Sequence, residues 1–150
     1  MMTKEPFFIL EQKLSYQLIG IFIRISKEHG FSYKEKVYQR LLIEELKKQG
    51  LKYISQPKIP IFIAGSDKIL TYYYPDLLVE DKIIIEVKAQ NQIFNTHINQ
   101  LIKYLAVCKY EIGFIVNFGT PKAQILRRIY TNDRKHFTNS SQMAHPITRK

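Results

Sequence analysis

The chain has 150 residues, of which 45% are hydrophobic and 13% aromatic, a composition that excludes general disorder and fits one domain. The single cysteine, Cys108, excludes an internal disulfide framework and a cysteine-based zinc site. No apolar run reaches the roughly 18 residues of a membrane span, and the N-terminus lacks a secretory signal pattern. We therefore expect a cytoplasmic protein with no membrane partner.

The chain carries a net charge of +10, and much of this excess lies near its C-terminus. Between Thr120 and Lys150 there are seven lysines and arginines but only one acidic residue, Asp133. A basic segment of this kind suits contact with nucleic-acid phosphates, although a solvated tail without a partner has the same composition. Arg127 and Arg128 are the candidate nucleic-acid contacts in this region.

Apolar residues at helical spacing predict a first helix over residues 5–29 and a second over residues 33–49. Gly30 and Gly50 follow these segments and are typical helix stops. Ser32 and Glu35 are three residues apart and predict a capping box at the start of the second helix.

Three strand-like segments follow, over residues 53–63, 68–79 and 82–89. Next come a predicted helix over residues 95–108 and strands over residues 111–118 and 125–130. From residue 131 the sequence is polar and aperiodic, so we expect a domain over residues 1–130 and a poorly ordered basic tail over residues 131–150. This order predicts an α/β fold in which helices cover both faces of a mixed central sheet.

The strand predicted over residues 82–89 places charge in an apolar environment. Because side chains alternate along a strand, Glu86 and Lys88 share one face with Ile84. The other face is wholly apolar and consists of Ile83, Ile85, Val87 and Ala89. Burying charges costs roughly several kcal/mol unless they are paired or bind an ion, so a functional role is one explanation. A solvated ion pair on an edge strand, worth roughly 0–1 kcal/mol, is the other.

The connection between the second and third strand segments decides where Asp76 lies. A two-residue loop at Glu80 and Asp81 would direct Asp76 away from Glu86. A three-residue loop over residues 80–82 would place Asp76 opposite Glu86 on the same face. We predict the second register, or a bulge near Asp76 with the same effect. Pro75 cannot donate a ladder hydrogen bond, which fits an irregularity there.

Two carboxylates and an amine that converge in this way suit metal-assisted hydrolysis of a phosphodiester. Mg²⁺ takes few carboxylate ligands and keeps several waters. Asp76 and Glu86 would hold the ion, with the backbone carbonyl of Val87 as a further ligand, and Mn²⁺ is the alternative metal. Lys88 would lie beside the attacking water and counter charge in the transition state.

The third predicted helix adds polar groups of weaker specificity. Gln100 and Tyr104 are four residues apart and share a face, so they could hold a phosphate and stack on nucleic acid. A surface glutamine and a half-buried core tyrosine have the same spacing. We interpret His97 as an ordinary surface histidine. Glu35 alone indicates a capping residue and Tyr38 a core aromatic residue.

Together these residues resemble the PD-(D/E)XK nuclease superfamily, whose motif here comprises Pro75, Asp76 and Glu86 to Lys88. Residues 100–104 (QLIKY) resemble the QxxxY motif of its RecB-like branch. Residues 32–38 (SYKEKVY) resemble the motif of the bacterial GxxExxY proteins, with Ser32 in place of the first glycine. Similarity covers roughly residues 10–130. It implies a three-layer αβα restriction-endonuclease-like core and a divalent-metal site in which Glu35 joins Asp76, Glu86 and Lys88, with Gln100 and Tyr104 nearby.

Three functions compete at this level. The first is a Mg²⁺-dependent nuclease acting on DNA, with its endo or exo mode undetermined. The second is a nucleic-acid-binding module on the same fold without turnover, and the third is a protein-interaction or defence accessory protein with a decayed site. The sequence sets no oligomeric state, and a homodimer is compatible with it.

Overall fold

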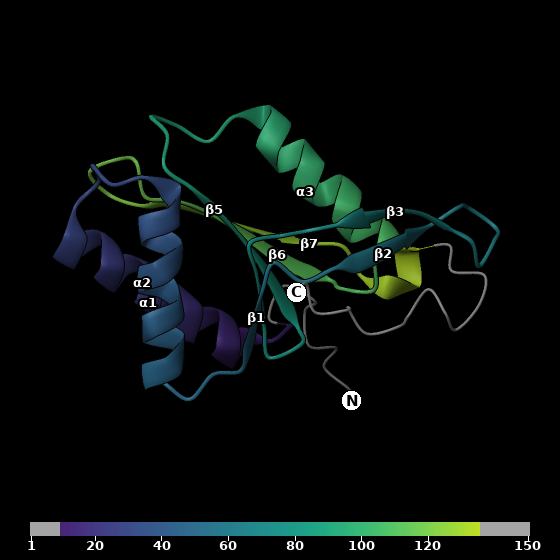
Figure 1. Ribbon diagram of the computed structural model, residues 1–150, viewed down its shortest axis with the longest axis horizontal. Coiled ribbons are helices and arrows are strands. Elements are labelled where there is room, and N and C mark those ends of the chain that lie inside the picture. The colour runs from purple at the N-terminus through teal and green to yellow at the C-terminus, as the bar shows by residue number, and fades with distance from the viewer. Residues whose placement is uncertain (1–9, 136–150) are drawn as a thin grey trace, which may run out of the picture.

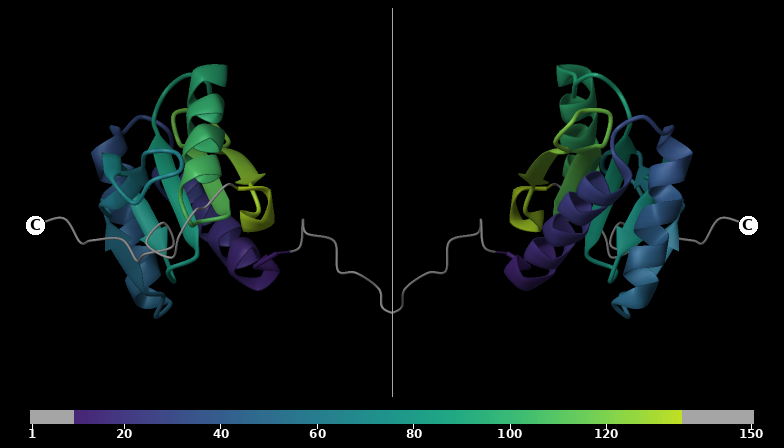
Figure 2. Two further views of the ribbon diagram at one scale, coloured as in Figure 1. Left: turned by 90° about the vertical axis from the view of Figure 1, so that its right-hand side faces the viewer. Right: turned by 90° about the vertical axis from the view of Figure 1, so that its left-hand side faces the viewer.

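The computed structural model describes residues 10–135 and has three layers (Figures 1 and 2). Two helices, α1 and α2, cover one face of a five-stranded sheet, and α3 with a two-stranded hairpin covers the other. The helices are α1 (Gln12–His29), α2 (Glu35–Lys48) and α3 (Asn95–Val107). The sheet contains β1 (Tyr53–Ser55), β4 (Leu77–Val79), β5 (Ile83–Lys88), β6 (Ile112–Asn117) and β7 (Gln124–Ile129), and the hairpin contains β2 (Ile59–Phe62) and β3 (Ile69–Tyr73). This arrangement confirms the predicted αβα architecture.

All three predicted helices are present, and two of them end where glycine permits a left-handed backbone. Gly30 caps α1 with φ 73°, and Gly50 follows α2 with φ 69°. After α2, the Leu51 N–H donates to the Leu46 carbonyl at 3.0 Å, which satisfies one of the final carbonyls of the helix. The start predicted for the first helix, at residue 5, lies outside the described residues.

The capping box predicted for α2 is wrong. The N-cap is Lys34, which makes no side-chain cap hydrogen bond, and Glu35 is the first helical residue instead of the third. The loop before α2 is held by Tyr38, whose hydroxyl donates to the Gly30 carbonyl at 2.7 Å and accepts from the Tyr33 N–H at 3.3 Å. Tyr38 is fully buried, as the sequence predicted. Glu35 is therefore not used as a cap.

The strands predicted over residues 53–63 and 68–79 each divide into two short strands. The first becomes β1 and β2, and the second becomes β3 and β4. Each break falls at a proline, because Pro57 and Pro75 cannot donate to a ladder. Gln56, before the first break, adopts φ 49°. As a result β1 pairs with β4 in the main sheet, whereas β2 pairs with β3 as a separate hairpin.

The main sheet is mixed, with strand order β1-β4-β5-β6-β7. Only β5 and β6 are parallel, and α3 provides the crossover between them. Strand β5 lies in the middle, so its charged residues are not on a sheet edge.

The predicted register between β4 and β5 is confirmed. Leu77 pairs with Ile85 and Val79 with Ile83, which leaves a three-residue loop over residues 80–82. Glu80 and Asp81 in that loop adopt φ 53° and 51°. One step beyond β4, the same register places Asp76 opposite Glu86.

The alternation of side chains on β5 divides the core into two halves, as predicted. Ile83, Ile85 and Val87 pack with α1 and α2. Ile84 packs on the other side with α3 and the hairpin. Glu86 and Lys88 alternate with the first set and so face the layer of α3.

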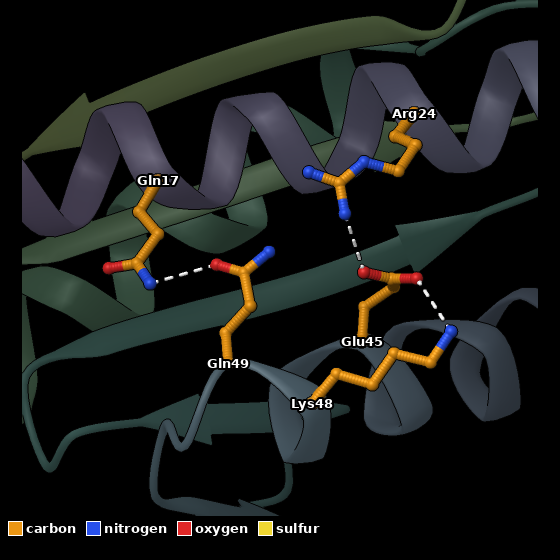
Figure 3. A network of polar contacts seen from close by, with 5 residues as sticks. All are labelled: Gln17, Arg24, Glu45, Lys48 and Gln49. Carbon is orange, nitrogen blue, oxygen red and sulfur yellow. Dashed lines mark hydrogen bonds and ion pairs between the residues drawn. The ribbon is translucent and has the colours of Figure 1, made fainter.

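Helices α1 and α2 are joined by polar contacts (Figure 3). Glu45 is 9% exposed and receives Arg24 from α1 at 2.9 Å and Lys48 at 3.5 Å. The Gln17 amide donates to Gln49 at 2.8 Å. Because Glu45 is buried, its charge is stabilised by these two cations, and the contacts from Arg24 and Gln17 fix how α2 lies against α1.

The last described residues extend past the predicted domain end. Asn132–Arg134 form a 3-10 helix. The Lys135 ammonium donates to the carbonyls of Cys108 at 2.9 Å and Tyr110 at 2.8 Å. The rest of the predicted tail, residues 136–150, lies outside the described residues. None of the helices within residues 10–135 combines the length and apolar character that a membrane span requires.

Candidate active site

Two carboxylates meet where β4 begins and β5 ends. The Asp76 backbone N–H donates to Glu86 Oε1 at 3.2 Å. The Val87 N–H donates to Asp76 Oδ2 at 2.7 Å. The side chain of Asp76 thus takes the place of a backbone acceptor at the end of the ladder. Each carboxylate accepts a hydrogen bond from a backbone N–H of the segment that carries the other.

Proline explains why the ladder ends here. Extending the β4–β5 register by two residues places Pro75 opposite Val87. At this position the Val87 carbonyl would accept from the N–H of residue 75, which proline lacks. Pro75 therefore donates no hydrogen bond to the Val87 carbonyl. Whether this carbonyl serves as a metal ligand stays a prediction.

The carboxylate pair is electrostatically unfavourable without a cation. Burial, followed by the charge of Asp76, raises the pKa of Glu86 from 4.5 to about 7, against the lowering influence of Tyr73, the Asp76 N–H and Lys88. Burial and then the charge of Glu35 raise the pKa of Asp76, while the Val87 N–H and Lys88 lower it. Two adjacent carboxylates that resist ionisation form a site that a divalent cation would stabilise.

Tyr73 holds Glu86 in place, and sequence reasoning missed it. Its hydroxyl donates to Glu86 Oε2 at 2.9 Å. Its ring stacks on Tyr104 of α3, with centroids 3.9 Å apart and planes 5° apart. One ring face of Tyr104 is therefore covered by Tyr73. Three consecutive tyrosines, residues 72–74, were a signal in the sequence, because side chains alternate along a strand and at least one of the three must face the core.

Two further charged residues, Glu35 and Lys88, influence this pair, and both also influence the pKa of His97. The charge of Glu35, from the start of α2, raises the pKa of Asp76, and that of Lys88 lowers it. His97, in the first turn of α3, has a pKa lowered first by burial and then by Lys88, while Glu35 raises it. The sequence interpretation of His97 as an ordinary surface residue overlooked this proximity. Helix α2 thus contributes the charge of Glu35 to this end of β5, and His97 of α3 lies near enough for Lys88 and Glu35 to influence its pKa.

The segment after β5 is clamped to β6. Asn117 is fully buried and both donates to and accepts from the Gln90 backbone at 2.9 Å. The Phe118 N–H donates to the Lys88 carbonyl at 2.9 Å. A Cβ at Gly119 would lie 2.3 Å from the Gln90 oxygen, so only glycine fits there. Asn117 and Gly119 were not predicted as site residues, yet they fix the backbone that carries Lys88.

The remaining predicted nucleic-acid contacts lie apart from one another. Gln100 is exposed on α3. Arg127 faces α1, where its guanidinium donates to Ser15 Oγ at 3.1 Å and to the Leu10 carbonyl. Arg128 follows it on β7, so its side chain points to the opposite face. A ligand on one face of the sheet cannot contact both arginines, and Arg127 has a structural role in anchoring α1.

The donors present fit Mg²⁺ better than a metal that needs a full set of protein ligands. Within residues 10–135 no three His, Cys, Asp or Glu side chains converge as a metal-binding group. The predicted joint set of Glu35, Asp76 and Glu86 is therefore not assembled as three direct ligands. The adjacent carboxylates of Asp76 and Glu86 are nevertheless the donor set that Mg²⁺ uses when waters and phosphate oxygens complete its shell.

Comparison with known proteins agrees with this geometry. The family model of the PD-(D/E)XK nuclease superfamily matches residues 12–129, which include the first helix and all seven strands. No curated protein and no solved structure matches the chain significantly. Members of this superfamily are typically nucleases that use divalent metals. Given this match over most of its length, the chain belongs to the PD-(D/E)XK nuclease superfamily.

Proposed function

We propose that the protein is a divalent-metal-dependent nuclease that hydrolyses phosphodiester bonds in DNA, with Mg²⁺ as the metal and Mn²⁺ as a substitute. The observation that carries this proposal is the Asp76–Glu86 pair in the middle of the sheet, which is linked by hydrogen bonds and in which burial raises the pKa of both carboxyl groups. Two carboxylates whose negative charges are disfavoured would be stabilised by a bound cation. Lys88, two residues after Glu86, suits contact with a phosphate. The proposal includes membership of the GxxExxY group and a cytoplasmic location, which the lone cysteine favours.

Each residue has a distinct role in this proposal. Asp76 and Glu86 hold the cation, and the Val87 carbonyl adds a ligand. When bound, a divalent cation neutralises phosphate charge and lowers the pKa of water. Lys88 orients the attacking water and offsets the charge that develops on the phosphate. Glu35 acts at longer range through Asp76, and Gln100 and Arg128 contact the nucleic acid.

Removing the amine of Lys88 tests the function most directly. We expect the wild-type protein to cleave linear or circular DNA with Mg²⁺ or Mn²⁺ and not with chelator. Lys88→Ala should slow cleavage roughly 100- to 1,000-fold, since loss of one charge-stabilising donor costs about 3–4 kcal/mol of barrier. Gel-based cleavage assays on duplex, single-stranded and circular DNA measure this. Lys27→Ala, on the exposed side of α1, is the matched control.

Other outcomes would point to the second candidate function. The net charge of +10 favours nucleic-acid binding even without turnover. Salt-sensitive binding that survives Asp76→Ala and Glu86→Ala, with no cleavage at any metal concentration, would establish a binding module. If wild type and Lys88→Ala behave alike at every metal concentration, the nuclease proposal fails, because cleavage that does not depend on Lys88 does not come from this site.

Tyr73 should act as a positioning residue for Glu86. We expect Tyr73→Phe to slow cleavage about 10- to 100-fold, because a hydrogen bond to a charged group contributes about 1.5–3 kcal/mol. The bond also lowers the pKa of Glu86, so its loss should move the acidic limb of the pH–rate profile to higher pH. A higher Mg²⁺ concentration for half-maximal rate is expected as well. The ring and its stacking on Tyr104 remain.

Tyr110→Phe provides the control for this change. It removes a hydroxyl that donates to a carboxylate, Asp81 Oδ1 at 2.7 Å, in the loop between β4 and β5, far along the sheet from Glu86. This variant should keep the wild-type pH profile. A reduced rate in Tyr73→Phe with no change in pH profile or Mg²⁺ dependence would mean that Tyr73 has only a structural role.

A further inference from the structure

Three polar residues lie side by side across the sheet at the end that carries the carboxylate pair. Lys88 on β5 pairs with Asn117 on β6, which in turn pairs with Gln124 on β7. Residues directly opposite each other in a sheet share a face, so all three side chains are on the face that α3 covers. Asn117 is fully buried, whereas Gln124 is exposed on the edge strand. We call Asn117 and Gln124 the amide pair.

The side-chain amide of Asn117 uses its full hydrogen-bonding capacity. Its oxygen accepts from the N–H of Gln90 at 2.9 Å and of Gly119 at 3.1 Å. Its nitrogen donates to the Gln90 carbonyl at 2.9 Å and to Gln124 Oε1 at 3.0 Å. A primary amide has two donor hydrogens and two acceptor lone pairs, and all of them are used here. This buried amide therefore holds the backbone two residues after Lys88 in one position.

Gln124 extends this contact to the start of α3. Its Oε1 accepts from the Ile93 N–H at 3.1 Å as well as from Asn117. Ile93 directly precedes Phe94, the N-cap of α3. Residues 89–94 run from the end of β5 to α3 and form no helix or strand of their own (Figure 1). The amide pair thus fixes this segment near both of its ends.

The segment over residues 89–94 joins two parts of the proposed active site. Lys88 lies directly before it, and the first turn of α3, with His97, lies directly after it. Burial, and then the charge of Lys88, lowers the pKa of His97, so the two side chains lie close enough to interact. A displacement of about 1 Å in a catalytic group can reduce a rate on the order of 100-fold. A shift of this segment would therefore slow the reaction even with both carboxylates in place.

We propose that Gln124 is a positioning residue, whose carbonyl oxygen, together with Asn117, holds residues 89–94 so that Lys88 keeps its place at the carboxylate pair. This inference rests on the proposed function for its effect on the rate, but the contact itself does not depend on turnover. Only the oxygen of Gln124 takes part. A carboxylate at this position can accept both hydrogen bonds, whereas a methyl group can accept neither.

Replacement of the exposed Gln124 tests this role, because removal of the fully buried Asn117 side chain would leave several backbone groups without partners. Gln124→Ala should lower the single-turnover rate of Mg²⁺-dependent cleavage at saturating DNA about 10- to 100-fold. Its Kd for DNA in chelator, measured by fluorescence anisotropy, should stay within about twofold of wild type, since no contact with the substrate is lost. Gln124→Glu should restore the rate to within about threefold of wild type.

Amide hydrogen exchange gives a readout that needs no activity. In chelator and without DNA, the Ile93 amide hydrogen should exchange about 5- to 10-fold faster in Gln124→Ala than in wild type, because it loses its acceptor. Gln124→Glu should keep the wild-type exchange rate. Gln12→Ala, at the exposed start of α1, removes a glutamine side chain elsewhere and should change neither the cleavage rate nor the exchange. Thermal melting checks that each variant is folded.

Several results would overturn the positioning role. One is an unchanged cleavage rate, or an unchanged exchange of the Ile93 amide, in a folded Gln124→Ala variant. Another is a weaker Kd with an unchanged rate at saturating DNA, because Gln124 would then contact the substrate directly. Failure of Gln124→Glu to restore the rate, although it restores the exchange, would also assign the lost activity to the amide nitrogen.

Failure of the nuclease proposal gives a different pattern. If the wild type cleaves no DNA, the enzyme assignment falls. Faster Ile93 exchange in Gln124→Ala and its reversal in Gln124→Glu would then still support the contact that holds residues 89–94. If cleavage requires Lys88 but not Gln124, the nuclease proposal stands and the positioning role falls.

Discussion

Asp76→Asn should reduce Mg²⁺-dependent cleavage on the order of 1,000-fold, equivalent to about 4 kcal/mol of barrier. Asn keeps an oxygen that can accept from the Val87 N–H, now 2.7 Å from Asp76 Oδ2. The strand junction should therefore remain intact. The lost property is the negative charge, which is what a cation needs and what burial disfavours. We expect a folded protein that has lost nearly all of its cleavage activity.

The measurement combines cleavage rates over a Mg²⁺ titration with thermal melting in chelator. Asp133→Asn, in the exposed 3-10 helix near the end of the described chain, removes the same charge without contacting the site. It should leave the rate unchanged. If Asp76→Asn cleaves DNA at the wild-type rate at every Mg²⁺ concentration, Asp76 is not a ligand.

Local rules narrowed the pairing of Asp76 to two registers, and the predicted three-residue loop is the one that places it opposite Glu86. Strand alternation places Glu86 and Lys88 on one face, and the loop over residues 80–82 sets the register of β4. Two contiguous strands joined by a short loop leave few alternatives. The mixed sheet and its covering helices followed from the order of the elements.

The parts that sequence could not predict depend on contacts between distant segments. Residues 53–63 look like one strand, but only the fold shows that Pro57 separates β1 from β2. The inward direction of Tyr73 depends on which face of the hairpin meets α3. The role of Arg127 depends on α1, more than a hundred residues away in sequence. Charge and periodicity do not specify such partners.

The error at Glu35 has a different origin, because the contacts that overrule the predicted cap join residues only five and eight apart. The spacing of Ser32 and Glu35 fits a capping box, and local rules favoured it. The hydroxyl of Tyr38 binds the Gly30 carbonyl and the Tyr33 N–H and so fixes the loop instead. Helix α2 therefore starts at Glu35, whose charge reaches Asp76. In this case one local side-chain contact replaced another, and the Glu35 carboxylate is not used for capping.

Glu86→Gln should stabilise the metal-free protein at pH 8 while it abolishes cleavage. Burial and Asp76 raise the pKa of Glu86 from 4.5 to about 7. The folded chain therefore holds this proton more tightly than the unfolded chain, and the stability it contributes is full below pH 4.5 and lost as pH rises through 7. Each pKa unit corresponds to about 1.4 kcal/mol, so the ionised group costs on the order of 3–4 kcal/mol at pH 8.

A neutral glutamine removes this cost, and its oxygen can still accept from the Asp76 N–H, 3.2 Å from Glu86 Oε1, while its amide donates to the Tyr73 hydroxyl oxygen, 2.9 Å from Glu86 Oε2. In chelator at pH 8, Glu86→Gln should melt on the order of 5 °C above wild type, and the difference should shrink at pH 5. Mg²⁺ reverses the order, because binding to the folded state raises the melting temperature of wild type but not of the variant. Glu28→Gln, on the exposed side of α1, should change neither value. A lower melting temperature for Glu86→Gln in chelator at pH 8 would mean that the ionised carboxylate is stabilised by its surroundings, and the argument for a cation at this pair would lose its electrostatic basis.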